Sequence, residues 1–165
     1  MNRATRIAVT LQVAIMLLSL LPPLWVRSTG TVVYLETEKM DPRALFRGDY
    51  VILGYRLAQD ILSAEMAQEA HDSGSAVFVT VSTDRPARFI AVALERPQLG
   101  PGQACIVGRA RGVGKSTAVD FPQIAQFFVP EGTGREIESR RGENLLARVA
   151  TSGRCNAVLL GLEAR

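Results

Sequence analysis

The sequence contains few of the side chains that metal enzymes and hydrolases commonly use. It has one histidine, His71, and two cysteines among 165 residues. One histidine excludes a multi-histidine metal site, and two cysteines are too few for a cysteine-rich zinc module. No Ser, Cys or acid is placed to suggest a catalytic dyad with His71 beyond ordinary adjacency. We therefore expect no metal and no other cofactor.

Acidic residues are absent from the first 27 positions, and this absence explains the formal net charge of +3. Arg3, Arg6 and Arg27 carry the whole excess, so residues 28–165 hold 16 basic and 16 acidic side chains. Binding to DNA or RNA requires clustered positive charge. The neutral balance of residues 28–165 therefore argues against a nucleic-acid partner.

Charge is also missing from residues 7–26, an apolar run that begins after Arg6. About 20 helical residues match a hydrocarbon core of about 30 Å. Trp25 would lie at the membrane interface, and Pro22-Pro23 would end or bend the helix near its outer end. The run predicts a transmembrane helix that contacts the lipid bilayer through residues 7–26.

The flanking arginines orient this predicted helix. Arg3 and Arg6 on the short N-terminal side favour a cytoplasmic N-terminus. The sequence thus predicts a single-pass anchor over residues 1–27 and a domain over residues 28–165 on the periplasmic or extracytoplasmic side. A cleaved signal peptide is the competing interpretation, but the run is longer than a usual signal and no A-x-A site follows it. A buried core helix is a third option.

The remaining chain has the pattern of a mainly β, α+β domain. Seven segments alternate or run apolar with β-branched residues, which is typical of strands. They are Thr31–Glu38, Asp49–Leu57, Ala76–Ser82, Arg88–Glu95, Ala104–Arg111, Leu145–Thr151 and Asn156–Leu162. Helix-forming residues predict a helix over Leu57–Ala70, and shorter helical turns are expected at Pro42–Phe46 and Gly134–Arg141. Ser152-Gly153-Arg154 indicates a hairpin turn between the last two strands.

One string near the start of this domain combines a tight turn with a core strand. Gly48 can adopt positive φ at the turn, and Asp49 can hydrogen-bond to turn amides. Period two places Tyr55 on the apolar face with Leu53, and Tyr50 on the other face. A turn that leads into a core strand explains most of this string without any ligand.

The same string resembles the signature of the bacterial GDYXXLXY family, as Gly48-Asp49-Tyr50-x-x-Leu53-x-Tyr55. The lead-in Asp41-Pro42-Arg43-x-Leu45-x-Arg47 is also similar, and Phe127–Glu138 resembles a second family motif. The resemblance implies a protein anchored in the bacterial cytoplasmic membrane, with a partner in the membrane, but no reaction. The candidate binding residues in these motifs are Asp41, Arg47, Gly48, Asp49, Tyr50, Tyr55, Arg135 and Glu136.

The region around Lys39 also resembles the nucleophile box of type I signal peptidases. Lys39 occupies the position of the nucleophilic Ser, and one extra residue separates Pro42 from Gly48. Lys115 is a candidate base, but a Ser–Lys dyad needs a hydroxyl beside it in a dry pocket. This resemblance predicts at most a hydrolase with altered or lost catalytic residues.

Cys105 and Cys155 lie in or beside two late predicted strands. In an oxidising compartment they could form a disulfide. Two buried small apolar side chains are the alternative. The sequence leaves both open.

Three classes of function remain. The leading hypothesis is an anchored accessory or assembly subunit whose β-domain binds another membrane or envelope protein. The second is the signal-peptidase-like hydrolase. The third is a small-ligand or cell-wall binding module, for which we expect an aromatic pocket near Tyr50 or Tyr55.

Overall fold

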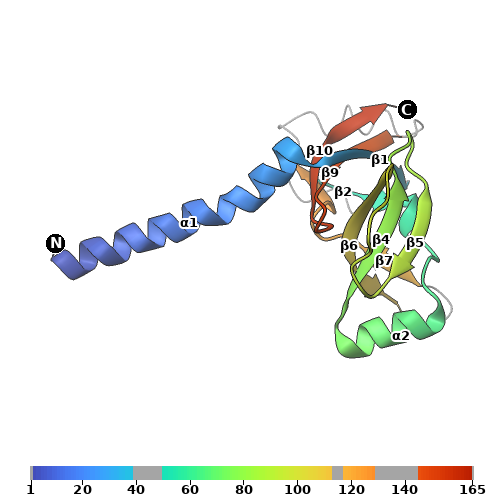
Figure 1. Ribbon diagram of the computed structural model, residues 1–165, viewed down its shortest axis with the longest axis horizontal. Coiled ribbons are helices and arrows are strands. Elements are labelled where there is room, and N and C mark those ends of the chain that lie inside the picture. Colours follow the sequence, from blue (N-terminus) through green and yellow to red (C-terminus); the bar gives the residue numbers. More distant parts are fainter. Residues whose placement is uncertain (1, 39–49, 113–116, 129–144, 165) are drawn as a thin grey trace.

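The computed structural model describes residues 2–38, 50–112, 117–128 and 145–164. A long helix projects from a β-rich domain (Figure 1). The elements are α1 (Arg3–Thr29), β1 (Thr31–Glu38), β2 (Tyr50–Ile52), β3 (Gly54–Tyr55), η2 (Arg56–Ala58), α2 (Ala64–Ser73), β4 (Ala76–Ser82), β5 (Phe89–Ala93), β6 (Gln103–Arg111), β7 (Ala118–Asp120), β8 (Gln126–Phe128), β9 (Leu145–Thr151) and β10 (Ala157–Ala164). The prediction of a mainly β fold after one long N-terminal helix is confirmed.

Helix α1 is apolar and almost wholly exposed. The helix has 27 residues, and an 18-residue stretch within it has a mean hydropathy of 2.1. None of that stretch is buried, and the helix is long and apolar enough to cross a membrane. The Asn2 side chain caps its start by accepting from Ala4 N at 2.7 Å. Pro22 and Pro23 lie inside the helix, which continues to Thr29. Of the two expected effects of these prolines, an end and a bend, the helix does not end there, and beyond the prolines the hydroxyls of Ser28 and Thr29 donate to Trp25 O.

The described residues of the domain form two four-stranded antiparallel sheets and a short two-stranded one. The first has the order β10-β9-β1-β3, the second β5-β4-β6-β7, and the third pairs β2 with β8. Strand β1 follows α1 directly and pairs with β9 in the register Thr31↔Thr151. The strand nearest the helix is therefore held by the last hairpin of the chain, β9–β10.

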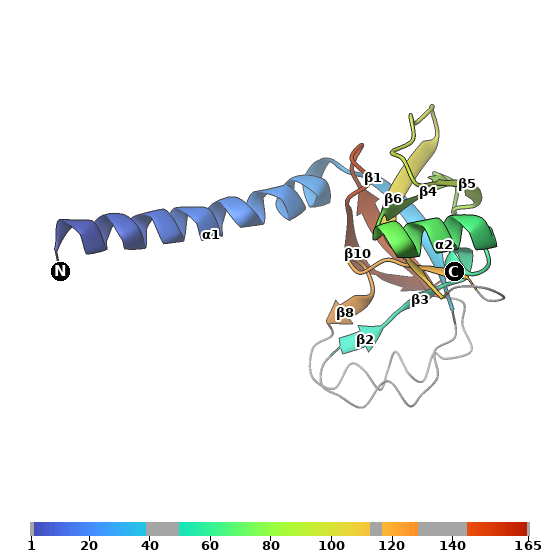
Figure 2. The same cartoon turned by 90° about the horizontal axis from the view of Figure 1, so that it is seen from below.

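One hydrophobic core joins the two larger sheets. Val33 and Leu35 of β1 meet Val79 of β4 and Ile106 of β6 in a single cluster, and all four are fully buried. Helix α2 adds Ala67 to the same core. It lies at the end of the domain away from α1, as the view from below also shows (Figures 1 and 2).

The predicted strand Asp49–Leu57 is divided. Tyr50–Ile52 pairs with β8, whereas Gly54–Tyr55 pairs with β1 in another sheet. Leu57 then lies in a 3-10 turn. The chain changes sheets at Leu53, so one alternating pattern serves two strands with different partners.

The predicted helix Leu57–Ala70 is also wrong in its first half. Leu57 and Ala58 lie in η2, Asp60 has a positive φ of 53°, and its backbone N donates to Thr117 O at 2.8 Å, so this stretch is not an α-helix. Helix α2 begins only at Ala64, where the Ser63 hydroxyl accepts from Met66 N at 3.2 Å. Gly74 closes the helix with φ 64°, the left-handed conformation that glycine adopts easily at a helix end.

Candidate functional site

The two family-like motifs meet in the small sheet β2–β8. Tyr50 pairs with Phe128 and Val51 with Phe127, so the first motif lies antiparallel to the start of the second. The segment before β8 continues the contact, because Leu53 N donates to Ala125 O at 2.8 Å. Sequence reasoning quoted both motifs but did not predict that they pair.

Tyr55 is a core residue. Its ring is 3% exposed and makes an edge contact with Phe121 at 5.9 Å between centroids. Its hydroxyl donates to Ile124 O at 2.6 Å. Burial raises the pKa of this hydroxyl well above its usual value. The ring and the hydroxyl are both used inside the fold, so the proposed binding role of Tyr55 gains no support and a structural role explains its place in the motif.

The other candidate motif residues cannot be placed in the same way. The backbone of Tyr50 is described in β2, while the remaining candidates lie outside the described residues: Asp41, Arg47, Gly48, Asp49, Arg135 and Glu136. The same holds for Lys39 and Lys115, on which the hydrolase hypothesis depends. These sequence-based expectations stay predictions.

Cys105 and Cys155 form a disulfide. Their Cα atoms are 4.7 Å apart, and both residues are fully buried. Val107 N of β6 also donates to Cys155 O at 2.9 Å. Cys155 has a positive φ of 63° in the β9–β10 turn, where its N donates to Ser152 O at 2.8 Å. The disulfide therefore fixes the turn of the last hairpin to the second sheet.

This turn lies beside the C-terminal end of α1. Val26 is the one residue of α1 that is buried, at 5% exposure. Gly30 N donates to Val26 O at 2.9 Å, and a Cβ at Gly30 would meet Val26 O and, at 2.8 Å, Thr151 O. The close approach of helix end and hairpin requires glycine, and β1 begins at the next residue.

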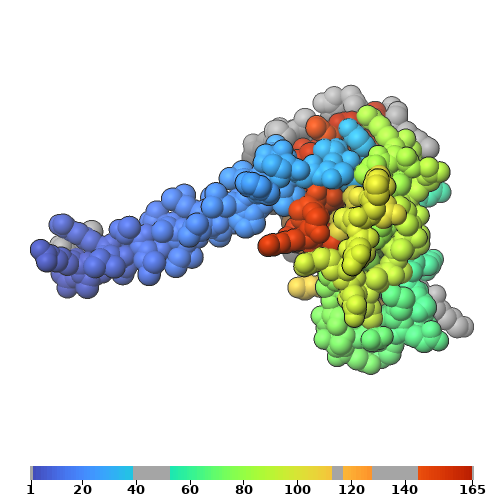
Figure 3. Space-filling view, in the orientation of Figure 1, coloured from blue at the N-terminus to red at the C-terminus, as the bar shows by residue number. Residues whose placement is uncertain are grey.

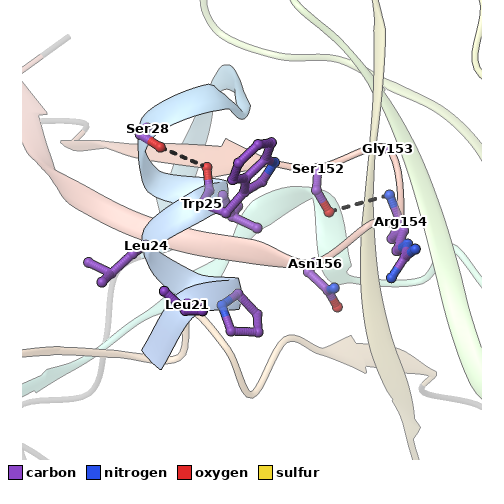
Figure 4. A pocket seen from close by; sticks show the side chains of 10 residues that line it. Leu21, Leu24, Trp25, Ser28, Ser152, Gly153, Arg154 and Asn156 are labelled. Carbon is purple, nitrogen blue, oxygen red and sulfur yellow. Dashed lines mark hydrogen bonds between the residues drawn. The ribbon is translucent and has the colours of Figure 1, made fainter. Parts of the chain in front are cut away.

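Next to this contact, an open groove of about 880 Å³ lies between α1 and the hairpin turn. In Figure 4 the Trp25 side chain extends from the helix toward the turn that carries Ser152 and Arg154, and the backbone N of Arg154 donates to Ser152 Oγ at 3.3 Å. The groove is apolar on the helix side and polar on the hairpin side. Its lining residues are Leu21, Pro22, Leu24, Trp25, Val26, Ser28, Ser152, Gly153, Arg154 and Asn156.

A second groove of about 450 Å³ lies on the neighbouring side of the same junction. Pro22, Pro23 and Val26 form its helix side, and Gln123 and Asn156 contribute polar groups from the domain. The two grooves share Pro22, Val26 and Asn156. Sequence reasoning placed Trp25 at interface depth but missed these grooves, because nothing local in the sequence shows that the hairpin comes back to α1.

The groove carries one cation without a partner. In the described part of the chain, the Arg154 guanidinium makes no ion pair or hydrogen bond, unlike Arg88, which contacts Asp84 Oδ2 at 2.6 Å. The hydrogen bond from Arg88 lowers the pKa of the Asp84 carboxyl.

Among the described residues, no three His, Cys, Asp or Glu side chains are grouped to hold a metal ion.

Comparison with known protein families identifies the chain. The model of the GDYXXLXY protein family matches residues 12–162, a range that includes most of α1 and nearly all of the domain. Comparison with curated proteins and with solved structures gave no match. Because the family model matches far more than half of the sequence, the chain belongs to the GDYXXLXY family.

Proposed function

We propose that the protein is a membrane-anchored accessory or assembly subunit whose β-rich domain binds another membrane or envelope protein. Helix α1 supports the anchor. A helix of 27 residues is about 40 Å long, enough to cross a hydrocarbon core of about 30 Å. Arg3 and Arg6 at its start favour an N-terminus in the cytoplasm and a domain on the periplasmic side.

The junction between helix and domain is the observation that carries this proposal. Only Gly30 separates α1 from β1, and Val26 is packed against the domain. A protein that is merely tethered to a membrane needs no such packing, since a flexible linker would suffice. Here the domain is held at a set height and orientation at the membrane surface, as a subunit that docks onto a membrane neighbour requires.

The chemistry of the junction fits a protein partner. The grooves combine apolar helix residues such as Leu21 and Trp25 with polar hairpin residues such as Asn156. Partner-binding surfaces commonly have an apolar centre with aromatic and Arg side chains and a polar rim. The balanced charge of residues 28–165 gives no general electrostatic attraction, so binding would depend on this local surface.

Site-directed photo-crosslinking tests the proposal. A photoreactive residue at Asn156, in both grooves, should join the full-length chain to one specific protein in intact cells. Glu65 on α2 is the matched control, because it is exposed and lies far from the junction (Figure 1). Equal adducts from both positions, or none from Asn156, would contradict the proposal.

Topology is tested separately. A reporter fused after the last residue should be active only on the periplasmic side, and the intact chain should stay in the membrane after alkaline extraction. A reporter active in the cytoplasm would overturn the proposed orientation. Loss of the first 27 residues from the mature protein would show a cleaved signal instead of an anchor.

A further inference from the structure

We propose that α1 pairs with a transmembrane helix of a different protein along the face that contains Gln12, and that this partner helix ends beneath the β-domain. The inference rests on the proposed function, because it requires α1 to span a membrane. It names the surface and the chemistry of the partner: an apolar helix with a polar side chain at the depth of Gln12.

Gln12 is the polar group that α1 does not satisfy by itself. Three polar side chains lie in the apolar run, Thr10, Gln12 and Ser19. Thr10 Oγ1 donates to Arg6 O at 2.9 Å, and Ser19 Oγ donates to Met16 O at 2.7 Å. The Gln12 carboxamide has no hydrogen bond within the described chain. Gln12 lies about 8 Å inside the run from Ile7, where lipid offers few hydrogen-bonding groups.

A buried amide in hydrocarbon is costly unless another polar group meets it. Gln and Asn side chains in membrane helices commonly hydrogen-bond across a helix pair, where small neighbours allow close approach. On the Gln12 face, Ala8 and Ser19 are small. Residues at intervals of three or four share one face of a helix, and on the Gln12 face these include Ala8, Ile15 and Ser19.

This face leads to the junction grooves. The same spacing continues from Ser19 to Pro22 and Val26, which line both grooves. Val26 is the residue that α1 packs against the domain. The Gln12 face is therefore the one that the domain overhangs. A partner helix along it would reach the polar side chain of Asn156 as it leaves the membrane.

The overhang favours a different protein over a second copy of this chain. The domain lies to one side of the α1 axis (Figures 1 and 3). Two copies paired through their Gln12 faces around a two-fold axis would each direct the domain over the other helix. Both domains would then need the same space. A partner with only a short segment above the membrane fits beneath the hairpin.

The test uses photoreactive residues along α1 of the full-length chain in its own membrane. Ile15 and Ser19 lie on the Gln12 face, and Leu17 lies on the opposite face as control. We expect Ile15 and Ser19 to give one adduct with another protein, attached within an apolar segment that carries a polar side chain. The adduct at Leu17 should be several-fold weaker.

Substitution of Gln12 ties the adduct to its carboxamide. Gln12→Leu should lower the yield from Ile15 roughly 3- to 20-fold, the range that interhelical hydrogen bonds in membranes give. Gln12→Asn should retain much of the yield, and Val13→Leu, on the far side of the helix, should leave it unchanged. Equal yields for the glutamine and leucine forms would overturn the role of Gln12.

The possible outcomes separate this inference from the proposed function. An adduct of the chain with itself would overturn the inference in favour of a second copy. Adducts at Asn156 without adducts at Ile15 or Ser19 would overturn it while the accessory-subunit proposal stands. Absence of a protein adduct at all three positions would overturn both.

Discussion

The Tyr55 hydroxyl donates a 2.6 Å hydrogen bond to the backbone carbonyl of Ile124, which is fully buried. This bond links the end of the first family motif to the segment that leads into the second. Tyr55→Phe removes the donor and leaves a buried carbonyl oxygen without this partner. We expect a loss of about 1–3 kcal/mol in the free energy of unfolding. Urea denaturation of the full-length chain in detergent measures it.

Tyr34→Phe is the matched control for this bond. The Tyr34 ring lies beneath the Arg85 guanidinium at 4.3 Å, and its hydroxyl makes no hydrogen bond in the described structure. Its removal should change stability by less than about 0.5 kcal/mol. Equal losses in the free energy of unfolding at the two positions would show that the hydrogen bond to Ile124 O does not stabilise the fold.

The same tyrosine makes stability sensitive to high pH. Burial raises the pKa of the Tyr55 hydroxyl above its value in the unfolded chain, which is about 10. A group whose pKa is higher in the folded state contributes its full stability below the unfolded pKa and loses it as the pH rises beyond that value. The stability difference between the native chain and Tyr55→Phe should therefore shrink above about pH 10. A constant difference from pH 8 to 11 would contradict this assignment.

Reduction of the disulfide should loosen the last hairpin. Cys105 and Cys155 are 50 residues apart in sequence, and a crosslink that closes a loop of this size contributes about 2–4 kcal/mol. The double variant Cys105→Ala with Cys155→Ala should lose that amount, and reductant should then have no further effect on its urea midpoint. If reductant leaves the midpoint of the native chain unchanged, the bond does not stabilise the domain.

Gly30→Ala should disrupt the junction of helix and domain. The added Cβ would meet Val26 O and Thr151 O, both backbone atoms that cannot move independently. Such overpacking costs about 1–3 kcal/mol. We also expect faster trypsin cleavage after Arg27, which is exposed at the end of α1. Gly153→Ala is the control, because no atom lies within 4 Å of its added Cβ. Identical digestion of the two variants would show that the junction tolerates a side chain at Gly30.

Elements with a strong local pattern could be predicted from the sequence. The segments Thr31–Glu38, Ala76–Ser82 and Leu145–Thr151 have the strand bounds that were expected. Each has β-branched residues and enough length for its apolar pattern to show. The strands Ala118–Asp120 and Gln126–Phe128 were missed, since three residues are too few for a period to appear.

The wrong predictions of local structure share one physical cause: contacts with distant parts of the chain decided the conformation. Leu57 and Ile61 contact the core at a spacing that would suit a helix, but Asp60 has a positive φ and its N bonds to Thr117 O, so the chain between them is not an α-helix. In β5, an unbroken alternation of period two would put Ile90 on the same face as Val92 and Leu94. A register shift in the pairing of β4 with β5 leaves Ile90 42% exposed instead. Local spacing does not record which distant strand supplies the hydrogen bonds.

The candidate site was predictable only in part, for the same reason. The motif residues Tyr50 and Phe127 can be read from the sequence, but their meeting in one small sheet depends on the whole fold. The grooves at α1 depend on a hairpin that lies more than 100 residues later in the chain. Gln12 was visible as a polar residue in an apolar run. Its importance appears only beside Thr10 and Ser19, whose hydroxyls bond to the helix itself.

The pairing of β1 with β9 also sets the order in which the protein can be completed. The strand that follows α1 is made early, yet its long partner, Leu145–Thr151, is among the last segments to be synthesised. Contacts of such high sequence separation form late and slowly. The domain therefore cannot close around β1 during synthesis. Until the last hairpin arrives, β1 exposes an unpaired edge, and a chain truncated before residue 145 would be expected to aggregate or be degraded.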